Sequence, residues 1–181
     1  MVCNSPRPFH PLIFDILTNL SGFVHSQNVD RLWRKNRQGA PRGANPACIG
    51  RDINRNWPYA WGSNPRGAST NPCSQTYQGE KPGDTPEIKG LDGLVRELAA
   101  GPGIKLYIDW HSYGQYILSP YGFNETLYAP ELGKWTNAAQ LVSTRIRNSS
   151  PARTTFIFGP SGATRTYFLT LLLFSSHLCV L

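Results

Sequence analysis

The sequence predicts an α/β fold, and this prediction depends on two helical segments that alternate with an extended segment in the second half of the chain. Apolar residues recur at helical spacing in residues 85–100 and again in residues 130–147. A β-type segment, residues 104–110, lies between them, and such alternation is typical of α/β domains. The 181 residues fit one domain, and a hydrophobic content of 40% is enough for a core.

The first part of the chain is predicted to contain one short strand and one long ordered loop. Leu12–Leu17 is an apolar run bounded by Asn19 and Gly22, which predicts a buried strand. Residues 32–64 are rich in Gly, Pro, Asn and Trp, and they show no sustained period. Long ordered loops tend to carry function, so this loop is a candidate for binding residues.

The clearest helix is predicted from Pro86 to about residue 100. Thr85 can cap its first turn, Pro86 suits the first helical position, and Glu87 suits the positive end of the helix dipole. Gly101, Pro102 and Gly103 then end the helix.

A strand over Ile104–Trp110 and a second helix over about Pro130–Arg147 follow. Leu106 and Ile108 lie on one side of this predicted strand. Ligands of open α/β sheets bind at the C-terminal ends of strands. His111 comes directly after the strand, so it is the histidine that we expect to matter most.

The chain is basic, with a formal net charge of +7 and a pI of about 9.5. Such a balance can indicate a nucleic acid, an acidic surface or an anionic substrate as partner. The positive charge is gathered in residues 31–42 and again at Arg51 and Arg55, and a solvated basic face is the plainest interpretation.

Cysteines occur at Cys3, Cys48, Cys73 and Cys179, and none forms a CxxC pair that would indicate a zinc ribbon. Cys48 and Cys73 flank a stretch rich in Gly, Asn and Pro. A disulfide between them would suit an oxidising compartment, and closing such a loop would stabilise the fold by about 3 kcal/mol. The residues alone leave this pairing open.

The sequence shows neither an export signal nor a membrane anchor. Met1–Pro11 carries Pro and Arg without a long apolar core, and the apolar run Tyr167–Leu181 is shorter than the about 20 residues that span a bilayer. Glycosylation motifs occur at Asn124-Glu125-Thr126 and at Asn148-Ser149-Ser150, and they are relevant if the protein is exported.

Two groups of residues could carry chemistry. His111 alone is more often structural than a metal ligand, because zinc needs three or four protein ligands. Arg55 lies beside Asn54, and a guanidinium with a neighbouring amide can bind a carboxylate. The alternative is that Arg55 forms an ion pair with Asp52 on the surface.

Four segments change this balance, because they stand in the order found in one enzyme family. They are Arg31–Lys35 (RLWRK), Asp52–Trp57 (DINRNW), Pro72–Tyr77 (PCSQTY) and His111–Gln115 (HSYGQ). In these segments the chain resembles the zinc carboxypeptidases of the carboxypeptidase A and B type, in a form closest to the fungal branch. The resemblance runs from about Ile16 to Tyr167 and covers the central half of the family's catalytic domain. Asn19–Gln27 is similar to the strand and turn that precede RLWRK.

The resemblance implies a Zn²⁺ enzyme that removes residues from the C-termini of peptides and proteins. It implies that His111 is the third zinc ligand, and that Asn54 and Arg55 bind the terminal carboxylate. Arg34 would polarise the scissile carbonyl. Residues implied to contact upstream parts of the peptide are Ser112, Tyr113 and Arg31. Cys48 and Cys73 would form the family's disulfide, while Asp52 and Trp57 would hold the loop in shape.

The chain also departs from the family pattern. No HxxE motif, which supplies the other two zinc ligands, occurs in it, and the family's late catalytic Glu lies beyond the point where the resemblance ends. We therefore expect a mixed twisted sheet flanked by helices that lacks its N- and C-terminal parts. We expect an atypical lead in residues 1–15, a partial catalytic domain in residues 16–167 and an aberrant apolar tail in residues 168–181.

From these departures we expect the 181 residues by themselves to be inactive and not to retain zinc. The resemblance implies a monomer that is extracellular or vacuolar, with no nucleic-acid or membrane partner. The alternative is a non-catalytic protein that still binds peptide C-termini. A nucleic-acid binder is disfavoured because the arginines fall within the peptidase motifs.

Overall fold

The computed structural model describes residues 18–111 and 114–164 of the chain. The elements follow in the order α1 (Leu20–Asn28), a 3₁₀ turn η1 (Ile53–Arg55), α2 (Pro86–Ala100), β1 (Tyr116–Ser119), α3 (Leu132–Ser149) and β2 (Ile157–Pro160). The predicted strand Leu12–Leu17 and the predicted apolar tail of residues 168–181 lie outside the described residues. The α/β class is confirmed, because helices and a small sheet make up the described part.

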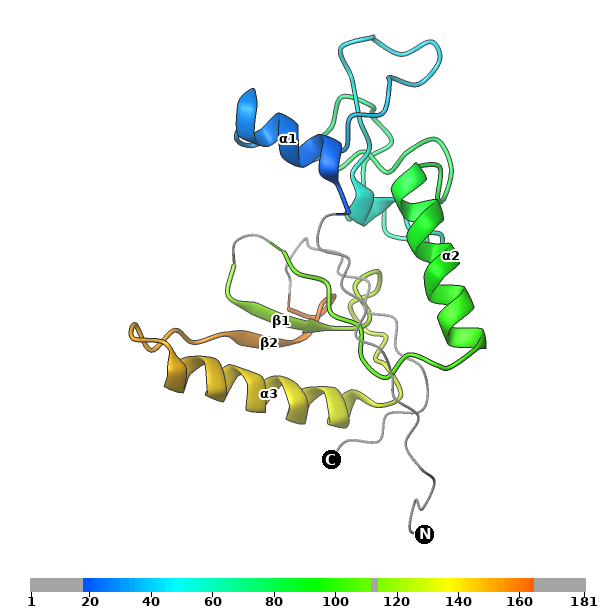
Figure 1. The fold of residues 1–181 in the computed structure, drawn as a ribbon. Helices are drawn as coiled ribbons and strands as arrows, with labels where there is room; N and C mark the ends of the chain where they lie inside the picture. The colour runs from blue at the N-terminus through cyan, green and yellow to red at the C-terminus, as the bar shows by residue number, and fades with distance from the viewer. Residues whose placement is uncertain (1–17, 112–113, 165–181) are drawn as a thin grey trace.

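The sheet belongs to a compact β1–α3–β2 unit. β1 and β2 are parallel, with Tyr116 opposite Ile157 and Ser119 opposite Pro160. Parallel neighbours need a crossover connection, which α3 provides, and Figure 1 shows α3 lying along both strands. The hydroxyl of Ser143 in α3 donates to the carbonyl of Phe156 at 3.0 Å, which fastens the helix to the start of β2. The prediction of a helix at about residues 130–147 is therefore confirmed.

Helix α2 begins and ends where the sequence predicts. The Thr85 hydroxyl accepts a hydrogen bond from the Ile88 N–H at 3.2 Å, and Pro86 occupies the first turn. Ile88 and Val95 are the buried residues of its apolar face. Gly101 caps its C-terminus.

Helix α1 covers Leu20–Asn28, so the expectation of a strand and turn over Asn19–Gln27 was wrong. The side chain of Asn19 accepts from the Gly22 N–H at 3.0 Å, which caps the first turn of α1. A Cβ atom on Gly22 would lie only 2.4 Å from the Lys35 carbonyl oxygen, so the helix packs this closely against the RLWRK segment because residue 22 is glycine. Local capping and packing thus favour a helix at this position.

The predicted strand Ile104–Trp110 was also wrong, because these residues have no regular secondary structure. A strand is stable only when a neighbour satisfies its backbone groups, and within residues 18–111 and 114–164 the sheet consists of β1 and β2 alone. Leu106, Ile108 and Trp110 are exposed by 62%, 53% and 87%. Apolar residues do alternate in this segment, but no other part of the described chain buries their side chains.

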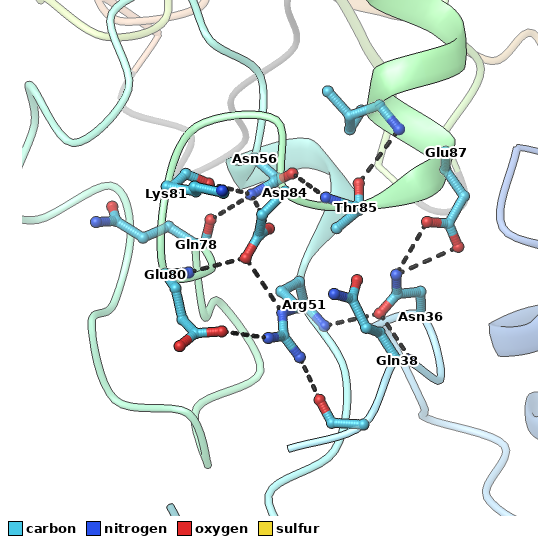
Figure 2. Close-up of polar contacts among 12 residues, drawn as sticks. Asn36, Gln38, Arg51, Asn56, Gln78, Glu80, Lys81, Asp84, Thr85 and Glu87 are labelled. Carbon is cyan, nitrogen blue, oxygen red and sulfur yellow. Dashed lines mark hydrogen bonds and ion pairs between the residues drawn. The ribbon is translucent and has the colours of Figure 1, made fainter. Parts of the chain in front are cut away.

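The long loop is ordered, as predicted, and buried polar residues hold it together (Figure 2). Asn56 is fully buried, and its amide donates to the carbonyl of Gln78 at 2.8 Å and to the carboxylate of Asp84 at 2.8 Å. The side-chain oxygen Oδ1 of Asn56 accepts from the Thr85 N–H at 3.1 Å. One side chain thereby joins the loop after η1 to the start of α2.

Arg51 is the second centre of this polar core. Its guanidinium donates to the Gly39 carbonyl and to the Glu80 carboxylate, the latter at 3.0 Å, and it lies 3.6 Å from the Asp84 carboxylate. Asn36 accepts from the Arg51 N–H at 2.9 Å and donates to Glu87 of α2. These bonds replace regular structure in satisfying the buried groups of the loop.

A disulfide joins Cys48 to Cys73, with the two Cα atoms 4.4 Å apart, so the pairing implied by the resemblance is confirmed. Among the described residues, no helix combines the length and the apolar character needed to span a bilayer.

Candidate functional site

Asp52 organises the centre of the candidate site. It is buried, with 2% of its surface exposed, and it precedes η1. One carboxylate oxygen accepts from the Asn54 N–H at 3.1 Å, which caps the 3₁₀ turn. The other accepts from Nε of Arg34 at 2.7 Å. Asp52 therefore links the RLWRK segment to the DINRNW segment and aligns the guanidinium of Arg34.

Arg55 is buried as well, with 5% of its surface exposed. Its Nη1 donates to the carbonyl of Asn54 at 2.9 Å. Burial lowers the pKa of Arg55 from its ordinary value; the charge of Asp52 opposes this shift and the charge of Arg34 adds to it. An arginine remains protonated at neutral pH after such a shift. The alternative of a surface ion pair between Arg55 and Asp52 was wrong, because both residues are buried.

A hollow opens beside this arginine. Asn54 and Arg55 form one side of it, and further along it is lined by Trp57, Tyr59, Trp61 and Phe123. The side-chain oxygen and nitrogen of Asn54 are both buried, and among the described residues neither has a hydrogen-bond partner. Buried amides are nearly always satisfied, so a polar group without partners among the described residues makes Asn54 a candidate for contact with a ligand.

Aromatic contacts join the loop after η1 to the residues that follow β1: Tyr59 and Phe123 line the hollow, and Tyr121 lies against both of them. Tyr59 stacks on Tyr121 with ring centroids 6.3 Å apart, and it meets Phe123 edge-on at 5.6 Å. Burial and the neighbouring Tyr121 raise the pKa of Tyr59. Sequence reasoning missed these residues, although the aromatic density of WPYAW and YGF was a usable signal.

The other predicted site residues are not among the described residues that line the hollow. Arg31 is exposed in the turn at the start of the RLWRK segment. Ser112 and Tyr113 lie outside the described residues. His111 is not among the residues that line the hollow; its Nε2 lies 3.0 Å from the carboxylate of Asp109. The structure thus brings together Arg34, Asn54 and Arg55.

The described residues do not fit a zinc site. Across residues 18–111 and 114–164, no group of three His, Cys, Asp or Glu side chains is close enough together to hold a metal ion. A catalytic zinc needs three protein ligands and a water, and His111 with Asp109 supplies fewer. No chemical step is therefore assigned to a metal in this part of the molecule.

Part of the basic cluster is structural. Lys35 and Arg51 are each only 2% exposed, and Nζ of Lys35 donates to the Pro72 carbonyl at 2.8 Å. Burial, with Arg51 adding and Asp52 opposing, lowers the pKa of Lys35. These two charges stabilise the loop and do not contribute to a basic surface.

The arrangement is suited to an anion with two oxygens. A carboxylate in the hollow could accept from the amide of Asn54 and pair with the Arg55 guanidinium, and charge-assisted bonds of this kind are roughly twice as strong as neutral ones. The aromatic rings would cover the apolar part of the same ligand.

Comparisons with known proteins identify the family of the chain. The sequence model of the zinc carboxypeptidase family matches residues 11–170. The chain is 49% identical over 121 residues to metallocarboxypeptidase A of Trichophyton rubrum, an alignment that covers 65% of this chain and 28% of the relative. It is 36% identical over 146 residues to mast cell carboxypeptidase A of Rattus norvegicus, covering 81% and 33% of the two chains.

The fold also matches that of a solved carboxypeptidase. The crystal structure of carboxypeptidase A from Helicoverpa armigera superposes with a TM-score of 0.72 at 29% identity, and the match covers 80% of this chain and 34% of that one. The chain therefore spans 28% to 34% of the length of these three proteins.

Proposed function

Because the chain belongs to the zinc carboxypeptidase family, we propose that it forms the part of a metallocarboxypeptidase that recognises the free C-terminal carboxylate of a peptide. We propose that residues 16–167 are a partial catalytic domain and that they contain this recognition site. The observation that carries the proposal is the buried, unpartnered amide of Asn54 next to Arg55 in one hollow. A chain terminus offers the two-oxygen anion that this pair can bind, whereas an internal peptide bond does not.

The remaining roles that we propose are those that the family resemblance implies. Arg34, aligned by Asp52, faces the developing negative charge on the carbonyl oxygen of the bond to be cleaved. Arg31, Ser112 and Tyr113 contact residues upstream of that bond. His111 contributes one ligand to the zinc ion that the family uses, and the described residues alone do not complete that site. We propose that the 181 residues by themselves bind a peptide end without turnover.

We propose that the protein acts outside the cell or in the vacuole. The support is the Cys48–Cys73 disulfide, because disulfides persist in oxidising compartments. We also propose that the folded chain is a monomer.

The decisive experiment compares two peptides of one sequence that differ only in a free or an amidated C-terminus. Isothermal titration calorimetry should show that the free acid binds at least about tenfold more tightly, since the amide forgoes a charge-assisted contact worth roughly 1.5–3 kcal/mol. Equal affinity for the two peptides contradicts the proposal. Arg55→Gln should abolish the preference, and Arg66→Gln, which removes an exposed guanidinium, should preserve it.

A non-catalytic C-terminus-binding protein is the second candidate, and a zinc determination separates it from an enzyme. Metal bound near one equivalent per chain, together with release of C-terminal residues, would contradict the proposed inactivity of these 181 residues. Binding of the free-acid peptide without release is the expected result for the chain and leaves the second candidate standing. In this assay release of the residue distinguishes the two candidates, because only an enzyme releases it.

A further inference from the structure

The loop between β1 and α3 contains a motif that the peptidase chemistry does not use. Asn124, Glu125 and Thr126 form an N-x-T sequence, and all three residues are exposed. Hydrogen bonds from the Thr126 and Leu127 N–H groups to the Asn124 side chain define the turn, and the carboxylate of Glu125 also lies 3.4 Å from the Arg66 guanidinium. The motif therefore has a defined conformation at the surface.

The contacts of Asn124 converge on one atom. Its Oδ1 accepts from the Thr126 N–H at 2.8 Å, from the Thr126 hydroxyl at 3.0 Å and from the Leu127 N–H at 3.1 Å. Among the described residues no hydrogen bond involves its Nδ2, which is the atom that carries the sugar in N-linked glycoproteins. A glycan on Nδ2 would leave all three bonds intact, so the turn is compatible with the modified side chain.

The second motif, Asn148-Ser149-Ser150, has a different geometry. Asn148 lies within the last turn of α3, and Ser150 follows the end of that helix. The Ser150 hydroxyl pairs with the hydroxyl of Thr154 at 3.0 Å. The hydroxyl of this motif therefore pairs with Thr154, whereas the hydroxyl of Thr126 is bonded to the side chain of the acceptor asparagine.

We propose that Asn124 is N-glycosylated, and to a higher occupancy than Asn148. The donor is an oligosaccharide linked to a polyprenyl pyrophosphate. Nδ2 of Asn124 attacks C1 of the first sugar, the bond from C1 to the pyrophosphate oxygen breaks, the polyprenyl pyrophosphate leaves, and Nδ2 gives up one proton. The inference rests on passage through the secretory pathway, which the Cys48–Cys73 disulfide supports.

The modification has a physical consequence for the same loop. Leu127 and Tyr128 directly follow the motif and are exposed by 44% and 49%. A hydrated oligosaccharide on Asn124 covers these apolar side chains and makes the surface more soluble.

The test is to secrete the full chain from a eukaryotic host behind an added signal peptide, with a known glycoprotein co-expressed as a control. Peptide-N-glycosidase treatment in ¹⁸O water converts each glycosylated Asn to a labelled Asp, which mass spectrometry then quantifies. We expect label at Asn124 in most molecules and clearly less at Asn148. Label at Asn124 that is absent, or no higher than at Asn148, while the control is modified, overturns the proposal.

Two substitutions provide the matched controls. Thr126→Val removes the hydroxyl with little change of shape and should abolish the label at Asn124, whereas Thr126→Ser keeps the hydroxyl and should retain it. Label that persists in the valine variant contradicts the proposed role of Thr126. Because the signal peptide is supplied, these outcomes are independent of the carboxypeptidase assignment and of the natural location of the protein.

Discussion

Nε of Arg34 lies 2.7 Å from Oδ2 of Asp52, and this ion pair connects the two motifs that carry the candidate site. The carboxylate is almost fully buried, with 3% of its side chain exposed, while the Arg34 side chain remains 29% exposed. One end of the pair is therefore fixed in the loop, and the other faces the solvent side, where a ligand can approach.

Replacing Asp52 by Asn should weaken both the fold and peptide binding. The change removes the charge of Asp52 from its ion pair with Arg34 and weakens the cap of η1, so we expect a loss of about 1–3 kcal/mol in the free energy of unfolding. Urea denaturation measures this loss. Glu125→Gln, which breaks the exposed pair with Arg66, is the control and should cost less than about 1 kcal/mol. Equal losses in the two variants would show that Asp52 has no special role.

Replacing Asn54 by Leu should separate stability from function. The Asn54 amide is buried without a partner among the described residues, so its removal should keep or raise the free energy of unfolding, by up to about 1 kcal/mol. Binding of a free-acid peptide should nevertheless fall, because the amide contact to the carboxylate is lost. Thermal denaturation and calorimetry on the same preparations check both parts. A variant that loses stability and keeps its affinity would contradict the ligand-binding role of Asn54.

The double substitution Cys48→Ser and Cys73→Ser should lower the free energy of unfolding by about 3 kcal/mol, because the open chain regains loop entropy. Adding a reductant to the wild-type chain should produce a similar loss. The same reductant should leave the double variant unchanged, which is the internal control. If neither the double substitution nor the reductant lowered the free energy of unfolding, the disulfide would constrain little of the unfolded chain.

Tyr77 should make the protein less stable at alkaline pH. Burial raises its pKa above the ordinary 10.0; Arg51 opposes the shift, and Glu80 and Asp84 add to it. Above pH 10 the unfolded chain loses this proton while the folded chain keeps it, so stability present below pH 10 is lost as the pH rises toward the raised pKa.

The comparison of wild type with Tyr77→Phe isolates this effect. Burial is the main cause that lowers the pKa of Lys35, so the contribution of Lys35 to stability increases as the pH rises toward 10.5. This contribution is the same in both proteins and does not affect their comparison. Urea midpoints measured from pH 9 to pH 11 should therefore fall more steeply in the wild type than in the variant. Parallel profiles would contradict a raised pKa at Tyr77.

The exposed segment of residues 104–110 should be detectable by fluorescence. Trp110 is 87% exposed, whereas Trp57 and Trp135 are each 9% exposed. Acrylamide should therefore quench a large fraction of the emission in the wild type and a much smaller fraction in Trp110→Phe. Trp57→Phe serves as the control and should leave the quenchable fraction almost unchanged. A quenchable fraction that does not respond to Trp110→Phe would show that this indole is covered in solution.

Helix α2 shows what sequence alone can determine. Its cap at Thr85, its proline at the first turn and its stop at Gly101 act within a few residues, so their effect does not depend on the rest of the fold. The order of the four motifs likewise determined the family, and the pairing of Cys48 with Cys73 followed from it. Adjacent residues such as Asn54 and Arg55 could also be assigned together, because one short turn positions both.

Only the tertiary structure decided which long-range partners these residues meet. The ion pair of Arg34 with Asp52 joins residues 18 positions apart, and the ring contacts of Tyr59 with Tyr121 and Phe123 join segments that are much further apart in the sequence. The segment of residues 104–110 has the pattern of a strand but lacks a paired neighbour among the described residues. Strand formation and buried charge pairs both depend on groups that are remote in sequence, and local periodicity carries no information about whether those groups are in place.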